Sequence, residues 1–170
     1  MTGRESPPPR YRWYDVPEGT QSLAIEWERF SSFGQAAARF RDGSCLYTLQ
    51  TADRSSLYVG KANGLRRRYA SASGALDAAL GNSTALVFVA AVESSLLDFL
   101  EHTIIFWDCP QYNARGIHTR PWPHVPLLHQ FDGVSSWWGS GPARETGGIY
   151  EGPLFCSPGQ VRAADTGVMV

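Results

Sequence analysis

Two stretches rich in aromatic and branched residues flank a short polar stretch in the first half of the chain. Cys45–Gln50 and Leu57–Gly60 have this composition, and the polar Thr51–Ser55 lies between them, which predicts a β-hairpin. If the turn is centred between Ala52 and Asp53, Tyr47 lies opposite Tyr58 on the neighbouring strand. Both hydroxyls would then project from one face of the sheet.

Helical periodicity marks segments on both sides of this hairpin. Phe33–Phe40 carries apolar residues at i, i+3, i+4 and i+7, which predicts a short helix. Ala62–Ser71 predicts a helix directly after the hairpin, and Ala75–Leu80 a second short helix after a break at Gly74. Leu23–Phe30 fits either a short strand or a helix.

A buried strand and a longer helix follow. Thr84–Val92 is apolar almost throughout, as expected of a strand that is buried on both faces. Ser94–Trp107 predicts a helix with one apolar stripe, and Pro110 follows its end. Glu101 lies between apolar residues at four-residue spacing, so we expect its side chain at the border of the buried face.

These elements predict an α/β protein of the α+β type. We expect a small three-stranded antiparallel sheet flanked by helices, in the order β-β-α-(α)-β-α, over residues 45–116. Residues 1–44 are expected to form a partly flexible N-terminal extension. Residues 117–170, rich in proline, tryptophan and glycine, are expected to form a C-terminal extension that packs on the core. A chain of 170 residues fits one domain.

Polar and aromatic residues stand at defined spacings within this core. Their order is Cys45-Leu46-Tyr47, then Tyr58-Val59-Gly60-Lys61, then Leu65 and Arg68, and finally Glu101 followed by Pro110 and Asn113. This order resembles the GIY-YIG nuclease family, with Cys45 in place of the first motif glycine. The family's core also has the order of elements predicted above.

The resemblance implies a catalytic site and a metal ion. Glu101 would bind Mg²⁺, with Mn²⁺ as a substitute, and Arg68 would contact the scissile phosphate. Tyr47, paired with Tyr58, would be the general base. Lys61, Arg68 and the metal would favour its phenolate, because free tyrosine has a pKa of about 10.

Other residues are candidates for ordering the site or for binding nucleic acid. The resemblance gives Asn113 a role in ordering the site, although an asparagine here is also a common turn residue. Gly60 would let the substrate approach the backbone closely, and Arg66 and Arg67 would at most touch flanking phosphates. In the N-terminal segment, Arg10 and Arg12 alternate with aromatic residues, which suits either contact with a nucleic-acid strand or packing on the protein itself.

Net charge and cysteine content bear on the size of the nucleic-acid contact and on the cellular compartment. The formal net charge of −1 predicts either a small nucleic-acid footprint or a local concentration of positive charge, such as Lys61 with Arg66, Arg67 and Arg68. The cysteines are odd in number and lack a C-x-x-C pair, which fits a reducing compartment. The N-terminus lacks a secretory pattern and no apolar run is long enough to cross a bilayer. We therefore expect a cytoplasmic protein that does not enter a membrane.

Three functions remain open at this point. The first is a metal-dependent DNA endonuclease of restriction, phage defence, mobile elements or repair. The second is a ribonuclease or toxin with the same site, because nothing in the motif reads the 2′-hydroxyl of RNA. The third is a binding module that does not cleave. One site per chain should nick duplex DNA, so cutting both strands requires a homodimer, a second encounter or a reorientation.

Overall fold

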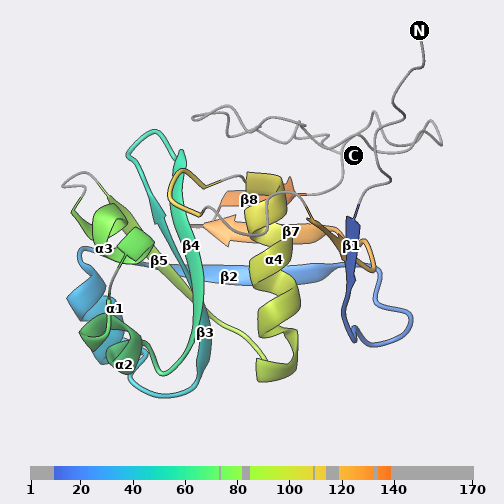
Figure 1. Cartoon of the computed structure of the whole chain (residues 1–170), viewed down its shortest axis with the longest axis horizontal. Helices are drawn as coiled ribbons and strands as arrows, with labels where there is room; N and C mark the ends of the chain where they lie inside the picture. The colour runs from blue at the N-terminus through green and yellow to red at the C-terminus, as the bar shows by residue number, and fades with distance from the viewer. Residues whose placement is uncertain are drawn as a thin grey trace, which may run out of the picture.

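A six-stranded sheet in the strand order β4-β3-β5-β2-β7-β8 forms the centre of the computed structural model (Figure 1). The model describes residues 10–72, 74–81, 85–108, 110–113, 119–131 and 134–138. The strands of this sheet are β2 Leu23–Phe30, β3 Ser44–Gln50, β4 Ser56–Asn63, β5 Leu86–Ala91, β7 Leu127–Phe131 and β8 Val134–Trp138. A separate two-stranded sheet pairs β1 Arg10–Trp13 with β6 Thr119–Trp122 in parallel.

The mixed α/β class is confirmed, but the prediction of a three-stranded sheet is wrong. The predicted strands β4, β3 and β5 are present and antiparallel, and they form only half of the sheet. β2 continues it antiparallel to β5, β7 lies parallel to β2, and β8 is antiparallel to β7. Segments outside residues 45–116 therefore supply three of the six strands.

Alternating burial explains the additional strands. In β2, Ile25 and Trp27 are buried while Glu26 and Glu28 are exposed, which settles the choice between strand and helix for this segment. β7 alternates in the same way, with Leu127, His129 and Phe131 buried. The rings of Trp27 and Phe131 stack with centroids 5.3 Å apart.

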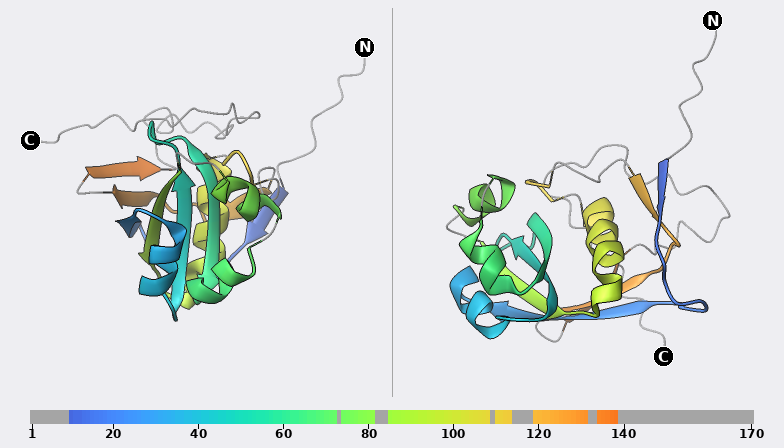
Figure 2. Two further views of the ribbon diagram at one scale, coloured as in Figure 1. Left: turned by 90° about the vertical axis from the view of Figure 1, so that its left-hand side faces the viewer. Right: turned by 60° about the horizontal axis from the view of Figure 1, so that its bottom comes forward.

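The helices cover both faces of the sheet (Figure 2). The helices α1 Phe33–Arg39, α2 Leu65–Ala70 and α3 Gly74–Leu80 pack on the face that carries Tyr47 and Leu49. The helix α4 Leu97–Asp108, preceded by a 3₁₀ turn at Ser94–Leu96, packs on the opposite face.

The predicted helices after the hairpin are present, with one boundary corrected. α2 begins later than predicted, because β4 continues to Asn63 and Gly64 then turns the chain at φ 98°. The predicted burial of β5 on both faces is confirmed, since Val87, Phe88, Val89 and Ala90 are all buried. Among the described residues, no helix has both the length and the apolar character needed to cross a membrane.

The register of the β3–β4 hairpin differs from the predicted one. Tyr47 lies opposite Gly60, and Tyr58 lies opposite Leu49, so the predicted direct pairing of the two tyrosines is wrong. A register shift between Leu49 and Gln50 offsets the two strands at the start of the turn. The prediction that both tyrosines share a face is confirmed, because their rings stack with centroids 6.0 Å apart.

We predict that Leu127→Ala lowers the free energy of unfolding by about 2–5 kcal/mol, because it removes a fully buried side chain from β7. Urea denaturation measures the change. Leu128→Ala is the matched control, since Leu128 is only partly buried on the next position of the same strand, and it should have a smaller effect. Equal effects of the two substitutions would show that β7 does not insert into the core.

Candidate active site

Arg68 joins the two motif tyrosines on one face of the sheet. Its Nε donates a hydrogen bond to the Tyr47 hydroxyl at 3.1 Å, and its Nη2 donates to the Tyr58 hydroxyl at 3.5 Å. α2 follows directly after β4, and the Arg68 side chain reaches back to both strands of the hairpin. The three predicted residues Tyr47, Tyr58 and Arg68 are therefore brought together.

Gly60 makes this arrangement sterically feasible. A Cβ atom at Gly60 would lie 2.5 Å from both Cζ and the hydroxyl oxygen of Tyr47, closer than real Cβ contacts. The ring of Tyr47 thus lies across β4 directly over Gly60. The space that we expected a substrate to use at Gly60 is filled by this ring, so the glycine is explained by internal packing.

Lys61 and Glu101 form a second cluster on the opposite face. The Lys61 ammonium lies 2.9 Å from a carboxylate oxygen of Glu101, and it also donates to Asp98. The Glu101 side chain is 22% exposed, as its predicted border position requires. Asp98 was missed in the sequence, although it stands three residues before Glu101 and therefore on the same side of α4.

The expected position of Lys61 beside the tyrosine hydroxyls is wrong. Lys61 pairs with Leu46, whereas Tyr47 pairs with Gly60, and successive residues of a strand project to opposite faces. The ammonium therefore points toward α4. β4 separates the Arg68 cluster from the Lys61 cluster, but it carries residues of both.

Asn113 holds the outer edge of β4. Its side-chain Oδ1 accepts a hydrogen bond from the Val59 N–H at 2.8 Å, and its Nδ2 donates to the Val59 carbonyl, also at 2.8 Å. The backbone N–H of Tyr112 donates to the Leu57 carbonyl at 2.8 Å. The predicted ordering role of Asn113 thus has a physical basis, since it fixes the strand between the two clusters.

The remaining basic candidates lie at two places. Arg66 and Arg67 are exposed on α2, and Arg67 donates to the Asn63 carbonyl at 2.7 Å. Arg12 is exposed on β1 and lies over the Tyr14 ring, 5.1 Å from its centroid. Arg10 begins the same strand.

Burial governs the ionisation of Tyr47. Its side chain has 0% exposure, and desolvation together with Tyr58 raises its pKa, while the charge and hydrogen bond of Arg68 lower it only in part. The expectation that neighbouring positive charge favours the phenolate is therefore wrong for the protein alone.

Charge pairing governs the second cluster. Desolvation lowers the pKa of Lys61, but hydrogen bonds to Asp98 and Glu101 and their charges outweigh it and raise the pKa. The hydrogen bond from Lys61 lowers the pKa of Asp98, and the charges of Lys61 and Arg12 add to this effect. The two carboxylates thus already hold one cation, an ammonium group.

The carboxylates suit a hard divalent ion. Mg²⁺ takes oxygen ligands, is bound by one or two carboxylates and keeps several waters, and Asp98 and Glu101 supply such a pair on one turn of α4. No group of three or more histidine, cysteine or acidic side chains with metal-binding geometry occurs in the described part of the chain. The ligands from the protein would therefore be these two carboxylates.

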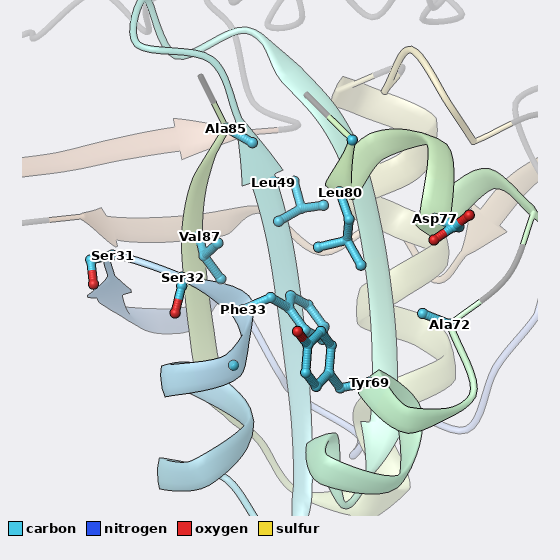
Figure 3. A pocket seen from close by; sticks show the side chains of 12 residues that line it. Ser31, Ser32, Phe33, Leu49, Tyr69, Ala72, Asp77, Leu80, Ala85 and Val87 are labelled. Carbon is cyan, nitrogen blue, oxygen red and sulfur yellow. The ribbon is translucent and has the colours of Figure 1, made fainter. Parts of the chain in front are cut away.

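A cavity of about 840 Å³ opens on the face that carries the tyrosines (Figure 3). Phe33 and Tyr69 line it, and Phe33 also contacts the ring of Tyr47, with centroids 5.3 Å apart. Ser31, Ser32 and Asp77 contribute its polar groups. The cavity therefore lies next to the packing partner of Tyr47.

Comparisons with protein-family models, with curated proteins and with solved structures returned no match. The resemblance to GIY-YIG nucleases therefore rests on the motif residues and on the order of the elements. It stays a hypothesis about family and function.

We predict that Gly60→Ala destabilises the protein by about 1–3 kcal/mol, because the new methyl group must displace the Tyr47 ring. Gly34→Ala on α1 is the matched control, since the nearest atoms there are 3.9 Å away. It should be neutral or stabilising by up to about 1 kcal/mol. Thermal or urea denaturation compares the two, and a tolerated Gly60→Ala would remove Tyr47 from its position over β4.

A second prediction concerns alkaline pH. Because the folded pKa of Tyr47 is raised above the unfolded value of about 10, the unfolded chain releases this proton first as the pH rises. The contribution to stability is complete below pH 10 and is lost above it, by up to about 1.4 kcal/mol per pH unit. Urea denaturation between pH 9 and 11.5 should show a smaller loss for Tyr47→Phe than for the parent protein. Parallel losses would contradict the burial of an un-ionised Tyr47.

Proposed function

We propose that the protein is a metal-dependent endonuclease that hydrolyses phosphodiester bonds in DNA. The observation that carries the proposal is the convergence of motif residues on one strand. Arg68 contacts both tyrosine hydroxyls on one face of β4, and Glu101 contacts Lys61 from the same strand on the other. Residues far apart in the sequence, at positions 47, 68 and 101, thus lie against β4, on its two faces.

Each group has a chemical task in this proposal. Arg68 presents a planar fork of donors that suits a phosphate and offsets the charge that grows on it. Asp98 and Glu101 would hold Mg²⁺ or Mn²⁺, and such an ion supplies positive charge at the phosphate and makes bound water more acidic. Before an ion binds, Lys61 neutralises the two carboxylates and keeps them together.

Besides the metal ion, the reaction uses water as the nucleophile, a group that accepts its proton and a group that gives a proton to the leaving oxygen. An oxygen of water bonds to phosphorus while the bond to the leaving oxygen breaks, one proton leaves the water, and one reaches the leaving oxygen. Tyr58 is the tyrosine that can contact this water, because its side chain is half-buried whereas Tyr47 is fully buried. Tyr47 then acts by holding Arg68 in position.

The biological setting that we propose is a cytoplasmic restriction, phage-defence, mobile-element or repair system. A ribonuclease or toxin would use the same groups, since none of them distinguishes DNA from RNA. A single set of these residues per chain is expected to cut one strand at each encounter.

Two observations favour a second candidate, a nucleic-acid-binding module that does not cleave. Burial disfavours the phenolate of Tyr47, and the Glu101 carboxylate is already paired with an ammonium group. Both features suit a scaffold that has kept the motif without the reaction. The two candidates differ in a single measurable property, cleavage in the presence of Mg²⁺.

The test is incubation of the purified chain with Mg²⁺ or with EDTA and supercoiled plasmid, single-stranded DNA or RNA. We predict Mg²⁺-dependent nicking of DNA, and a loss of at least about 10²-fold in Glu101→Gln, which removes a charged ligand while preserving shape. Asp98→Asn should also slow the reaction. Glu26→Gln, an exposed glutamate on β2, is the matched control and should cleave like the parent.

The outcomes separate the candidates. Cleavage that survives Glu101→Gln would remove this residue from the site. Binding to DNA without cleavage under any metal would favour the binding module. Cleavage of RNA alone would favour the ribonuclease.

A further inference from the structure

Two tryptophans lie side by side at the end of the small sheet. Trp13 on β1 pairs with Trp122 on β6, and their rings meet edge to face with centroids 5.5 Å apart. Trp13 is 73% exposed and Trp122 is 41% exposed. Tryptophan is enriched at surfaces that bind a partner, because it combines a large apolar ring with a polar N–H group.

The other side of the same strand is fixed to α4. The Tyr14 hydroxyl shares a hydrogen bond of 2.7 Å with His102 Nδ1, and its ring contacts Phe99 edge to face. The backbone N–H of Tyr14 donates to the Trp122 carbonyl at 2.8 Å, which continues the pairing of β1 with β6. The segment is therefore anchored, so the exposure of Trp13 is not due to a loose end.

This anchoring places the segment that carries the tryptophans against α4, the helix of the candidate metal ligands. His102 is the residue after Glu101 on α4, and it bonds to Tyr14, the residue after Trp13. Arg12, the residue before Trp13, is near enough to Asp98 for its charge to act on that carboxylate, after the larger effect of Lys61. A strand of nucleic acid at Asp98 and Glu101 thus has an arginine beside it, and the two exposed indoles lie on the other side of the same segment.

The charge of the chain explains why stacking would be needed. The formal net charge of −1 leaves few cations for contacts with phosphates, which normally supply most of the affinity for nucleic acid. Stacking on aromatic rings adds affinity without charge, because every base has a π-face. Paired bases in a duplex have no free face, so such a platform selects unpaired nucleotides.

We propose that Trp13 and Trp122 form a stacking platform for an unpaired base of the nucleic-acid substrate. The proposal rests on the proposed function and narrows its substrate class to strands with single-stranded or unpaired nucleotides near the cleavage site. Arg12 contacts the phosphate next to the stacked base.

The test measures binding in EDTA, so that cleavage does not enter. Fluorescence anisotropy compares a labelled 12-nucleotide oligo(dT) with a labelled duplex of equal length. Trp13→Ala should weaken oligo(dT) binding by roughly 5-fold to 150-fold, the range for losing one stacked base, and duplex binding by less than about 2-fold. Trp13→Phe keeps an aromatic face and should restore most of the affinity.

A pair of arginine variants checks the phosphate contact. Arg12→Ala should weaken binding to both oligonucleotides and reduce its salt dependence. Arg39→Ala is the matched control, because Arg39 is also exposed and lies over the neighbouring Phe40 ring at 5.6 Å, but on α1. It should bind like the parent. Unchanged circular dichroism and melting temperature in each variant exclude unfolding as the cause.

Failure of this proposal is distinguishable from failure of the proposed function. If the parent cleaves DNA with Mg²⁺ while Trp13→Ala binds and cleaves like it, the platform is overturned and the nuclease stands. If Trp13→Ala selectively loses oligo(dT) binding in a protein that never cleaves, the platform stands and the nuclease fails. Equal weakening of single-stranded and duplex binding overturns the platform. The parent protein could also bind no nucleic acid and instead associate with other copies of the chain in a way that Trp13→Ala abolishes. That result would assign the tryptophans to a protein interface and would also overturn the platform.

Discussion

The hydrogen bonds between Asn113 and Val59 are the contact on which the candidate site depends. β4 is the edge strand of the sheet, and an edge strand exposes unpaired N–H and C=O groups. The Asn113 amide satisfies both groups of Val59 at once, each at 2.8 Å. Val59 lies between Tyr58 on one side and Gly60 and Lys61 on the other along β4. The same contact therefore fixes the part of the strand from which both clusters are built.

The position of β4 gives the two faces different properties. On one face, Tyr47 is sealed under α1 and α2, so its hydroxyl serves to orient Arg68. On the other, Lys61, Asp98 and Glu101 remain partly exposed and carry the charge. We therefore interpret the first cluster as a rigid support for Arg68, which we propose binds phosphate, and the second as the candidate place for a metal ion. Tyr58 is half-buried on the Arg68 face of the same edge strand, where its hydroxyl accepts a hydrogen bond from Arg68.

Local patterns in the sequence predicted the hairpin, the helices and β5, because each of these has its own periodicity. The faces of β4 were also predictable in principle. Side chains alternate between the two faces of a strand, so Lys61 projects from the face opposite to that of Gly60 and Tyr58, and the ammonium group cannot lie beside the tyrosine hydroxyls. Asp98 likewise had a signal in its three-residue distance from Glu101. The sequence signal for the strand β7 was weaker, because a histidine occupies the central buried position of its alternating pattern. The buried His129 is stabilised by a hydrogen bond, which Trp27 Nε1 donates to its Nδ1 at 2.9 Å. Burial also lowers the pKa of His129 to about 3, so the imidazole is neutral. That partner lies 102 residues away in the sequence, so no local pattern could reveal it.

The position of a bound divalent ion is the most direct test of the candidate site. Mn²⁺ broadens the resonances of nuclei near it, so a substoichiometric amount added to ¹⁵N-labelled protein locates the ion. We expect selective loss of the amide signals of Lys61, Asp98 and Glu101, and no such loss in Glu101→Gln. Broadening centred on another carboxylate, such as Asp77, or a pattern that is unchanged in Glu101→Gln, would contradict a metal site on α4 beside β4.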